Sequence, residues 1–257
     1  MIDFAKYAFN KSHAACYAVV AYRTAYLKAY YPAEFMASML NSFLGNLDKI
    51  PDYIEECKRM EIEILKPDIN KSFGKFTVED GMIRFGLGSI KNVGIQPVDS
   101  IIKERETNGK FENFTDFCER MSEESVNKKC IESLIKAGTF TEFPETRATL
   151  LASFETIIDT IQSYNKKGMD GQVSMFDLGS ENNEEENNLN EIKYNFMERP
   201  ELNERELLSI EKEMLGIYIS GHPLEKIREQ IIATTNISSL QMREIDEMNS
   251  TVSQNEE

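Results

Sequence analysis

Residues 85–98 constrain the fold of this 257-residue chain more than any other segment does. Gly86, Gly88 and Gly94 interrupt a short run of apolar and basic residues, and apolar residues at helical spacing follow at once. Glycine permits tight backbone turns, and the first turn of a helix presents N–H groups that the helix itself does not accept. The pattern predicts a hairpin that leads into a helix with its amide groups facing outward.

A surface of this kind suits a phosphate group, and the residue order is that of a helix-hairpin-helix element, which holds the nucleic-acid backbone without reading bases. The N–H groups near Val93 and Gly94 and the ammonium group of Lys91 would contact phosphate oxygens. The alternative is an ordinary connection between a strand and a helix that needs glycine for positive φ. Residues 126–140 resemble a weaker second copy, with residues 134–138 in the hairpin position. The predicted DNA contacts are Gly88, Lys91, Asn92, Val93, Gly94, Lys128, Lys129 and Lys136.

The net charge of −15 argues against DNA binding, because phosphate contacts depend on Lys and Arg. The acidity is concentrated in the tail, however: 19 acidic and 7 basic residues follow residue 176, which leaves residues 1–176 with a net charge of −3. A nearly neutral body can still present a basic strip. Basic residues in or beside the two hairpin segments are Lys91, Lys103, Arg105, Lys110, Lys128, Lys129 and Lys136.

The spacing of apolar residues predicts a mainly α fold with a small β-hairpin and a tandem helix-hairpin-helix domain, followed by an acidic, flexible C-terminal region. Asp80 and Gly81 form the expected turn of the β-hairpin, and residues 62–65 alternate as a strand does. Helices are expected at residues 12–30, 33–44, 48–60, 95–105, 114–121, 125–137, 145–165 and 201–215.

The first of these helices carries apolar residues at helical spacing. They are Cys16, Val19, Val20 and Leu27, with Arg23 among them. At its start, Lys11 and His13 are attractive to a triphosphate, and the rings of Tyr7 and His13 offer faces on which a base can stack. The alternative is a capping segment in which Tyr7 packs into the core and His13 is an ordinary surface residue.

A short apolar pair stands apart from every predicted helix. Met175 and Phe176 lie between a helix and a stretch too charged to form a core, residues 179–195. An extended peptide can dock such a pair in a pocket of another protein, with Gln172 hydrogen-bonded at the rim. The alternative is that the pair folds back onto the hairpin domain.

The sequence offers no recognisable catalytic set. It has no carboxylate cluster for two Mg²⁺ ions and no P-loop, and two histidines do not build a Ser/His/Asp triad; His222 is expected in a turn. The four cysteines are far apart, so we expect buried thiols rather than a metal site. No signal peptide or transmembrane run is recognised, and we expect no membrane association and a cytoplasmic location.

Taken together, these segments resemble the C family of bacterial replicative DNA polymerases, the DNA polymerase III alpha subunits. The resemblance covers nearly the whole chain in the family's order. The matching segments are residues 7–13, 31–36, 67–70, 86–94, 126–138 and 215–224.

The resemblance implies a partial chain that begins inside the polymerase fingers and lacks the palm and the downstream OB domain. The implied divisions are 1–66 (fingers), 67–171 (β-hairpin and tandem helix-hairpin-helix domain), 172–178 (clamp-binding peptide), 179–195 (disordered linker) and 196–257 (helical segment). By the resemblance, Tyr7, Lys11 and His13 border the incoming dNTP, and Gln172, Met175 and Phe176 bind the sliding clamp, the beta subunit.

The implied activity of the longer protein is that of a DNA-directed DNA polymerase, a nucleotidyltransferase that uses Mg²⁺ held outside this chain. The chain alone is then expected to be inactive and to hold no cofactor or metal. Its expected partners are primer–template DNA, the incoming dNTP, the clamp and the rest of the polymerase III holoenzyme. A protein-interaction piece whose only working part is the residue 172–176 peptide is the alternative, and a DNA repair protein would require a catalytic set that we do not find.

Overall fold

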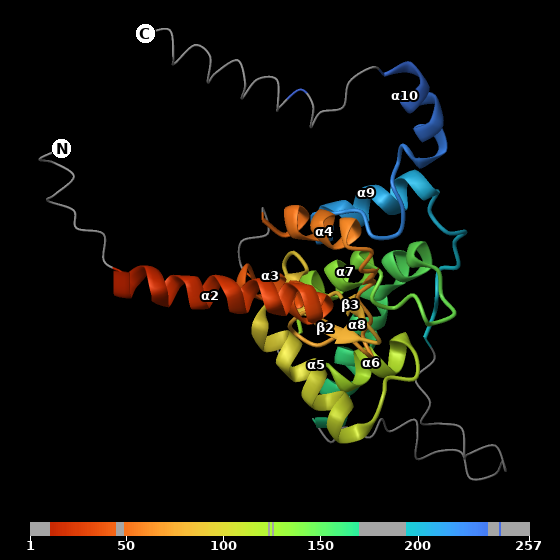
Figure 1. Ribbon diagram of the computed structural model, residues 1–257. Coiled ribbons are helices and arrows are strands. Elements are labelled where there is room, and N and C mark those ends of the chain that lie inside the picture. Colours follow the sequence, from red (N-terminus) through yellow and green to blue (C-terminus); the bar gives the residue numbers. More distant parts are fainter. Residues whose placement is uncertain are drawn as a thin grey trace, which may run out of the picture. The chain divides into compact units, whose positions relative to one another are not determined.

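A computed structural model describes residues 11–44, 49–122, 124, 126–169, 194–235 and 242. The chain divides into two compact units between Ile219 and Ser220. Within the described residues the first unit is mainly helical with one small sheet, which confirms the predicted fold class (Figure 1). Tyr7, the residue 172–176 peptide and nearly all of the acidic stretch lie outside the described residues.

The predicted helices of the first unit are confirmed to within a few residues at most ends. They are α2 (Lys11–Tyr30), α3 (Pro32–Ser42), α4 (Ile50–Arg59), α5 (Ile95–Asn108), α6 (Phe114–Arg120), α7 (Lys128–Ala137), α8 (Arg147–Met169) and α9 (Glu204–Leu215), with the 3-10 helix η2 (Leu87–Ser89). In the second unit the described elements are η4 (Glu225–Ile227) and α10 (Arg228–Thr234). His222 lies in a turn, as expected, where its Nδ1 accepts a hydrogen bond from the Leu224 amide.

Three short strands form the sheet. The central strand β3 (Met82–Arg84) pairs in antiparallel fashion with β2 (Thr77–Glu79) and in parallel fashion with β1 (Ile64–Leu65). Asp80 and Gly81 both have positive φ, which is the backbone of a two-residue type I′ turn and confirms the predicted hairpin. Because β3 leads straight into η2, the sheet fixes the start of the segment that the sequence singled out.

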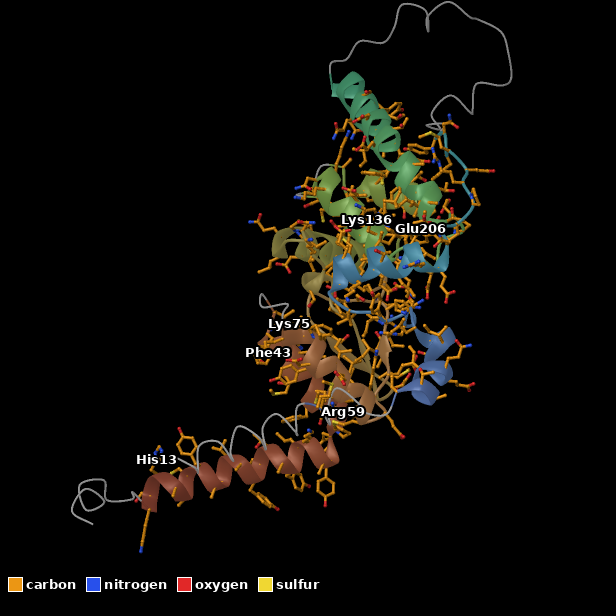
Figure 2. The ribbon with its side chains drawn as sticks, turned by 90° about the horizontal axis from the view of Figure 1, so that it is seen from above. His13, Phe43, Arg59, Lys75, Lys136 and Glu206 are labelled. Atoms are coloured by element: carbon orange, nitrogen blue, oxygen red, sulfur yellow. The ribbon has the colours of Figure 1, made fainter. Side chains whose placement is uncertain are left out.

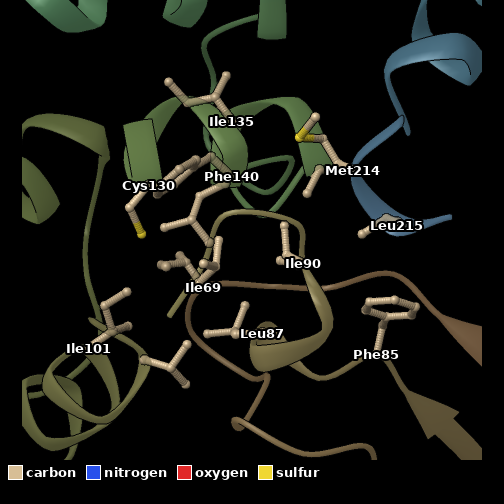
Figure 3. Packing of buried hydrophobic residues seen from close by; sticks show 14 of the residues in the cluster. Ile69, Phe85, Leu87, Ile90, Ile101, Cys130, Ile135, Phe140, Met214 and Leu215 are labelled. Carbon is tan, nitrogen blue, oxygen red and sulfur yellow. The ribbon is translucent and has the colours of Figure 1, made fainter. Parts of the chain in front are cut away.

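One hydrophobic core joins the helices before the sheet to those after it. Buried side chains of α3 and α4 pack in the same cluster as those of η2, α5, α7 and α9. In Figure 3 Ile90 lies between Leu87 below it and Met214 of α9 above it, and all three belong to one cluster with Ile135 of α7. The core therefore continues across residues 66 and 67, where the resemblance implies that the fingers end.

Helix α2 is an exception to this packing. None of its residues is buried, and its apolar residues stay open, with Val19 50% and Val20 56% exposed. Apolar residues at helical spacing therefore do not form a buried stripe on α2 within the described chain. Its contacts are made with α3 and through an ion pair between Lys28 and Glu56, whose Nζ and Oε1 are 2.7 Å apart.

Three of the four cysteines are buried, as expected. Burial raises the pKa of the Cys57 and Cys130 thiols to about 11, so both are protonated at neutral pH, and Cys118 shifts in the same direction. Among the described residues no group of three His, Cys, Asp or Glu side chains could hold a metal ion. None of the described helices has the length and apolar character needed to cross a membrane.

Candidate nucleic-acid interface

The first hairpin, residues 86–94, links β3 to α5 and alternates between core and surface. Leu87, Ile90 and Val93 are buried, whereas Lys91 and Gly94 are exposed. The apolar side chains anchor the turn, so the residues between them are held at the surface. The sequence pattern of apolar residues, Lys and Gly therefore has a direct structural reason.

Gly86 and Gly88 serve packing. The backbone of residues 86–88 lies against that of residues 73–75. The Leu87 N–H donates to the Phe73 carbonyl oxygen at 2.8 Å, and the Gly88 N–H donates to the Gly74 carbonyl oxygen at 3.0 Å. A Cβ added at Gly86 would lie 2.6 Å from a backbone carbon of Lys75, and one at Gly88 would lie 2.7 Å from the Gly74 oxygen. Close backbone approach, and not positive φ, requires glycine here, and the Gly88 amide predicted to contact DNA is already hydrogen-bonded.

The amide groups of the turn fall into two sets. The Lys91 N–H donates to the Met214 carbonyl at 3.0 Å, and the Val93 N–H donates to Ile90 at 3.1 Å, so these two are occupied. In the part of the chain that the structure describes, the N–H groups of Gly94, Ile95 and Gln96 have no acceptor. The N–H groups without an acceptor in the described chain therefore lie at the N-terminus of α5 and begin at Gly94, the residue after Val93.

Helix α5 has no side-chain cap and no acidic residue in its first turn. The next residue along it, Pro97, has no N–H group to satisfy. Asn92 adopts a φ of 65°, in the left-handed region that asparagine tolerates better than most residues. Its side-chain nitrogen, Nδ2, donates to the Ser133 hydroxyl of α7 at 3.4 Å. This geometry turns the chain so that the exposed residue Gly94 begins the helix.

The second hairpin lies later than the sequence indicates. Residues 134–137 belong to α7, and Gly138 ends that helix in the left-handed conformation with a φ of 80°. The expected hairpin position at residues 134–138 is therefore wrong, and the second hairpin is residues 138–146, which lead into α8. The error arose because Leu134 and Ile135 continue the apolar face of the helix.

The N-terminus of α8 is closed by a carboxylate. The Glu201 side chain accepts hydrogen bonds from the Arg147 N–H at 2.9 Å and from the Ala148 N–H at 3.2 Å. The Thr146 hydroxyl accepts a third, from the Thr149 N–H at 3.1 Å. The groups that remain open at α5 are thus occupied at α8.

Glu201 belongs to an extended segment, residues 194–203, which we call the strap. Its backbone is held by hydroxyl groups of α8: the Met197 N–H donates to Ser153 at 2.8 Å and the Arg199 N–H donates to Thr149 at 2.9 Å. The sequence reading missed Glu201 and these hydroxyls. Their spacing along α8 is visible in the sequence, but nothing local identifies the strap as their partner.

Only some of the residues of the predicted basic strip are exposed and not paired with a carboxylate in the described chain. Lys91 and Lys129 are exposed, while the ammonium group of Lys128 lies 2.5 Å from Asp159 and that of Lys136 lies 2.7 Å from Glu132. The prediction that Arg105 belongs to this basic surface is wrong. Its side chain is buried, donates a hydrogen bond to the Ile69 carbonyl at 2.9 Å and lies over the Phe73 ring.

Lys11 and His13 belong to α2, and Figure 2 shows His13 on this helix apart from Lys136 of α7. Both are exposed, and the His13 ring centroid is 4.4 Å from that of Tyr17. The structure does not bring them together with the α5 N-terminus. Helix α9, in contrast, packs against α7, and its Met214 carbonyl holds the first hairpin.

Beside the second hairpin lies a hollow of about 230 Å³, lined by Phe140, Arg147, Glu201 and neighbouring residues. Burial lowers the pKa of the Arg147 guanidinium, and the nearby carboxylates of Glu211 and Glu201 oppose that shift. An arginine remains charged under such conditions. The start of α8 therefore brings together a cation, two helix amides and the carboxylates of Glu201 and Glu211, and Glu145 lines the same hollow.

Comparisons with known proteins agree with this geometry. Residues 61–150 match the helix-hairpin-helix motif family. The chain is 43% identical over 238 residues to the DNA polymerase III subunit alpha of Borreliella burgdorferi and 42% identical over 244 residues to that of Bacillus subtilis. The matches cover 92% and 94% of this chain but 20% of each relative. The chain thus spans about one fifth of the length of these curated relatives.

Proposed function

As a segment homologous to about one fifth of a DNA polymerase III alpha subunit, this chain belongs to that family, and we propose that its first hairpin binds the backbone of duplex DNA during replication. The observation that carries the proposal is the open N-terminus of α5, where the amides of Gly94, Ile95 and Gln96 stand beside the exposed Lys91.

The physical basis is the charge of a helix end. Aligned peptide dipoles place roughly half a positive charge at a helix N-terminus, and unpaired N–H groups there hydrogen-bond anionic oxygens. An ammonium group adds a charge-assisted contact to the same phosphate backbone. No base edge is read by such contacts, so binding is expected to be independent of DNA sequence.

The test is a titration of primer–template DNA with the 257-residue chain at low and raised salt. Gly94→Val places a branched side chain at the open edge, where an added Cβ meets nothing closer than 3.5 Å within the protein. We expect duplex affinity to fall about tenfold, close to 1.4 kcal/mol, with the fold retained. Gly221→Val is the matched control, because a Cβ there also points into open space.

Equal affinity of Gly94→Val and the wild type would reject the first hairpin as the DNA contact. Absence of any binding at low salt would leave the competing function, a protein-interaction segment, which the net charge of −15 favours. Lys91→Ala sharpens the test, since losing one phosphate contact lowers the slope of log affinity against log salt by about 0.9.

We further propose that Tyr7, Lys11 and His13 help to position the incoming dNTP. The support is a helix that carries basic residues and no acidic residue in its first turn, together with the exposed His13 ring. Lys11→Ala should weaken dNTP binding in the longer polymerase; unchanged binding would remove this role.

Tethering to the sliding clamp by Gln172, Met175 and Phe176 is a proposal that rests on the sequence alone. A weak linear peptide raises the effective concentration of a polymerase at the primer end. Met175→Ala combined with Phe176→Ala should abolish binding to the clamp in a surface-binding assay, and unchanged affinity would reject the assignment.

For the longer polymerase we propose nucleotidyl transfer in the cytoplasm as part of the holoenzyme. There the primer 3′-hydroxyl would attack the α-phosphate of the dNTP and displace pyrophosphate, and Mg²⁺ ions held outside this chain would supply the charge stabilisation for that step. The contribution of this chain is to grip the duplex and to position the nucleotide, and we expect it to be inactive by itself.

A further inference from the structure

We infer that helix α9 holds the first hairpin in place, and that Glu211 of α9 is a positioning residue for it. Glu211 acts through the end of the helix, where the Met214 carbonyl accepts a hydrogen bond from the Lys91 N–H. The inference rests on the proposed function of the first hairpin and extends it, because it adds a buried residue that lies outside the hairpin.

The first argument is that the first hairpin is anchored at two places. Its start is held by backbone hydrogen bonds to residues 73–75, and its tip is held by α9, because the Lys91 N–H donates to the Met214 carbonyl oxygen at 3.0 Å. Met214 belongs to the same buried cluster as Ile90, the residue before Lys91 (Figure 3). The position of Lys91, an exposed cation of the hairpin, therefore depends on where α9 ends.

The second argument is how α9 ends. The last carbonyl groups of a helix have no N–H partner inside it, and the Met214 carbonyl is one of them. Gly216 ends the helix in the left-handed conformation with a φ of 78°, and the chain then turns back so that the Ile219 N–H donates to the Glu211 carboxylate. The two partners bracket Met214 in the sequence, so this hydrogen bond restricts how the last turn of α9 can move.

The third argument is the burial of Glu211. The residue is only 3% exposed, and a buried carboxylate is costly unless charges and hydrogen bonds compensate it. The compensation comes from the Ile219 N–H and from the nearby Arg147 guanidinium. Buried ionic groups often contribute less to stability than apolar residues of the same size. What Glu211 supplies is a fixed orientation of the end of α9, which carries the Met214 carbonyl.

The experiment uses the 257-residue chain and follows backbone amide hydrogen exchange by NMR in the absence of DNA. Glu211→Leu removes the carboxylate and places an apolar side chain of similar size at the buried position. Glu213→Leu, at an exposed position of the same helix, is the matched control. We expect the Lys91 N–H to exchange about tenfold faster in Glu211→Leu, whereas the Leu87 N–H, which residues 73–75 hold, keeps its rate in both variants.

Affinity for duplex DNA is the second readout. Removing a carboxylate from an acidic chain by itself favours DNA binding, so Glu213→Leu should bind at least as tightly as the wild type. Glu211→Leu should bind about fivefold more weakly despite the same change of charge, which is the low end of typical coupling between distant sites. Glu211→Gln, which keeps an acceptor oxygen for the Ile219 N–H, should recover both the binding and the slow Lys91 exchange.

The inference is overturned if the Lys91 N–H exchanges equally fast in Glu211→Leu and Glu213→Leu. Equal acceleration of the Lys91 and Leu87 amides also overturns it, because that result indicates general loosening of the fold. A duplex affinity of Glu211→Leu equal to that of a wild type that binds has the same consequence. If the wild type does not bind duplex, the proposed function fails alone, and the exchange rates still decide whether Glu211 positions the first hairpin.

A second pair of variants keeps the test decisive if Glu211→Leu does not fold. Gly216→Ala strains the left-handed residue that ends α9, and Gly109→Ala strains the residue with positive φ that ends α5. An added Cβ meets nothing within 4 Å at either glycine, so the two changes are matched in space as well as in strain. Faster Lys91 exchange in Gly216→Ala than in Gly109→Ala supports the inference, and equal rates overturn it.

Discussion

The two hairpins of this chain differ in what lies at the start of the helix that follows. At α5 the amides of Gly94, Ile95 and Gln96 are open within the described chain, while at α8 the Arg147 and Ala148 amides bind Glu201. The lysines differ less than the amides: Lys136 is paired with Glu132, but Lys91 and Lys129 are both exposed. A repeated motif therefore does not imply a repeated ligand, since the anion at each helix end is decided by the surrounding chain.

The largest expected effect concerns how the first hairpin is built. Gly88→Ala places a Cβ 2.7 Å from the Gly74 carbonyl oxygen, against backbone that cannot move aside easily. Overpacking of this kind should lower the free energy of unfolding by about 3 kcal/mol in chemical denaturation. Gly94→Ala is the control and should change stability by less than about 0.5 kcal/mol. Equal stability of the two variants would show that the first hairpin is not held by residues 73–75.

The second prediction makes the first hairpin resemble the second. Gly94 has a φ of −79° and a ψ of 167°, a backbone that suits an N-cap residue, so Gly94→Asp supplies α5 with its own carboxylate. Duplex affinity should fall at least tenfold, about 1.4 kcal/mol, while stability rises by a few tenths of a kcal/mol. Gly221→Asp carries the same charge elsewhere and should have a smaller effect on affinity. An unchanged affinity in Gly94→Asp contradicts the comparison.

The third prediction loosens the second hairpin. Thr149→Val removes the buried hydroxyl that accepts the Arg199 N–H, and leaves that amide without its partner. We expect a loss of about 1 kcal/mol in stability and faster hydrogen exchange at residues 196–203. Thr156→Val, at an exposed position of the same helix, should show neither change. Unaltered exchange would mean that the strap is held by other contacts.

The smallest effect is expected inside the first hairpin. The Ser89 hydroxyl is buried and has no hydrogen-bond partner within the described residues. Ser89→Ala should raise stability by about 0.5 kcal/mol in thermal unfolding and leave duplex affinity unchanged, because an unsatisfied buried hydroxyl is costly. Ser209→Ala, on the exposed surface of α9, should change neither quantity. A loss of duplex affinity in Ser89→Ala would connect this hydroxyl with DNA.

The sequence by itself determined the elements whose causes are local. The apolar spacing of residues 114–121 gave α6, Asp80 and Gly81 gave the type I′ turn, and Gly94 before an apolar run marked the start of α5. These features depend on φ preferences and on residues a few positions apart, so they can be predicted without knowing the rest of the fold.

Only the tertiary structure decided which amides remain open and which apolar residues are covered. The Lys91 N–H is occupied by Met214 and the Arg147 N–H by Glu201, two partners that lie far along the chain, and Val19 of α2 stays exposed although its spacing resembles that of a core residue. Hydrogen bonds and burial depend on what folds against a segment, and a single helix turn carries no record of that partner. For the same reason, the sequence located the first hairpin but placed the second too early, and it could not show that Glu201 occupies the amides at the start of α8.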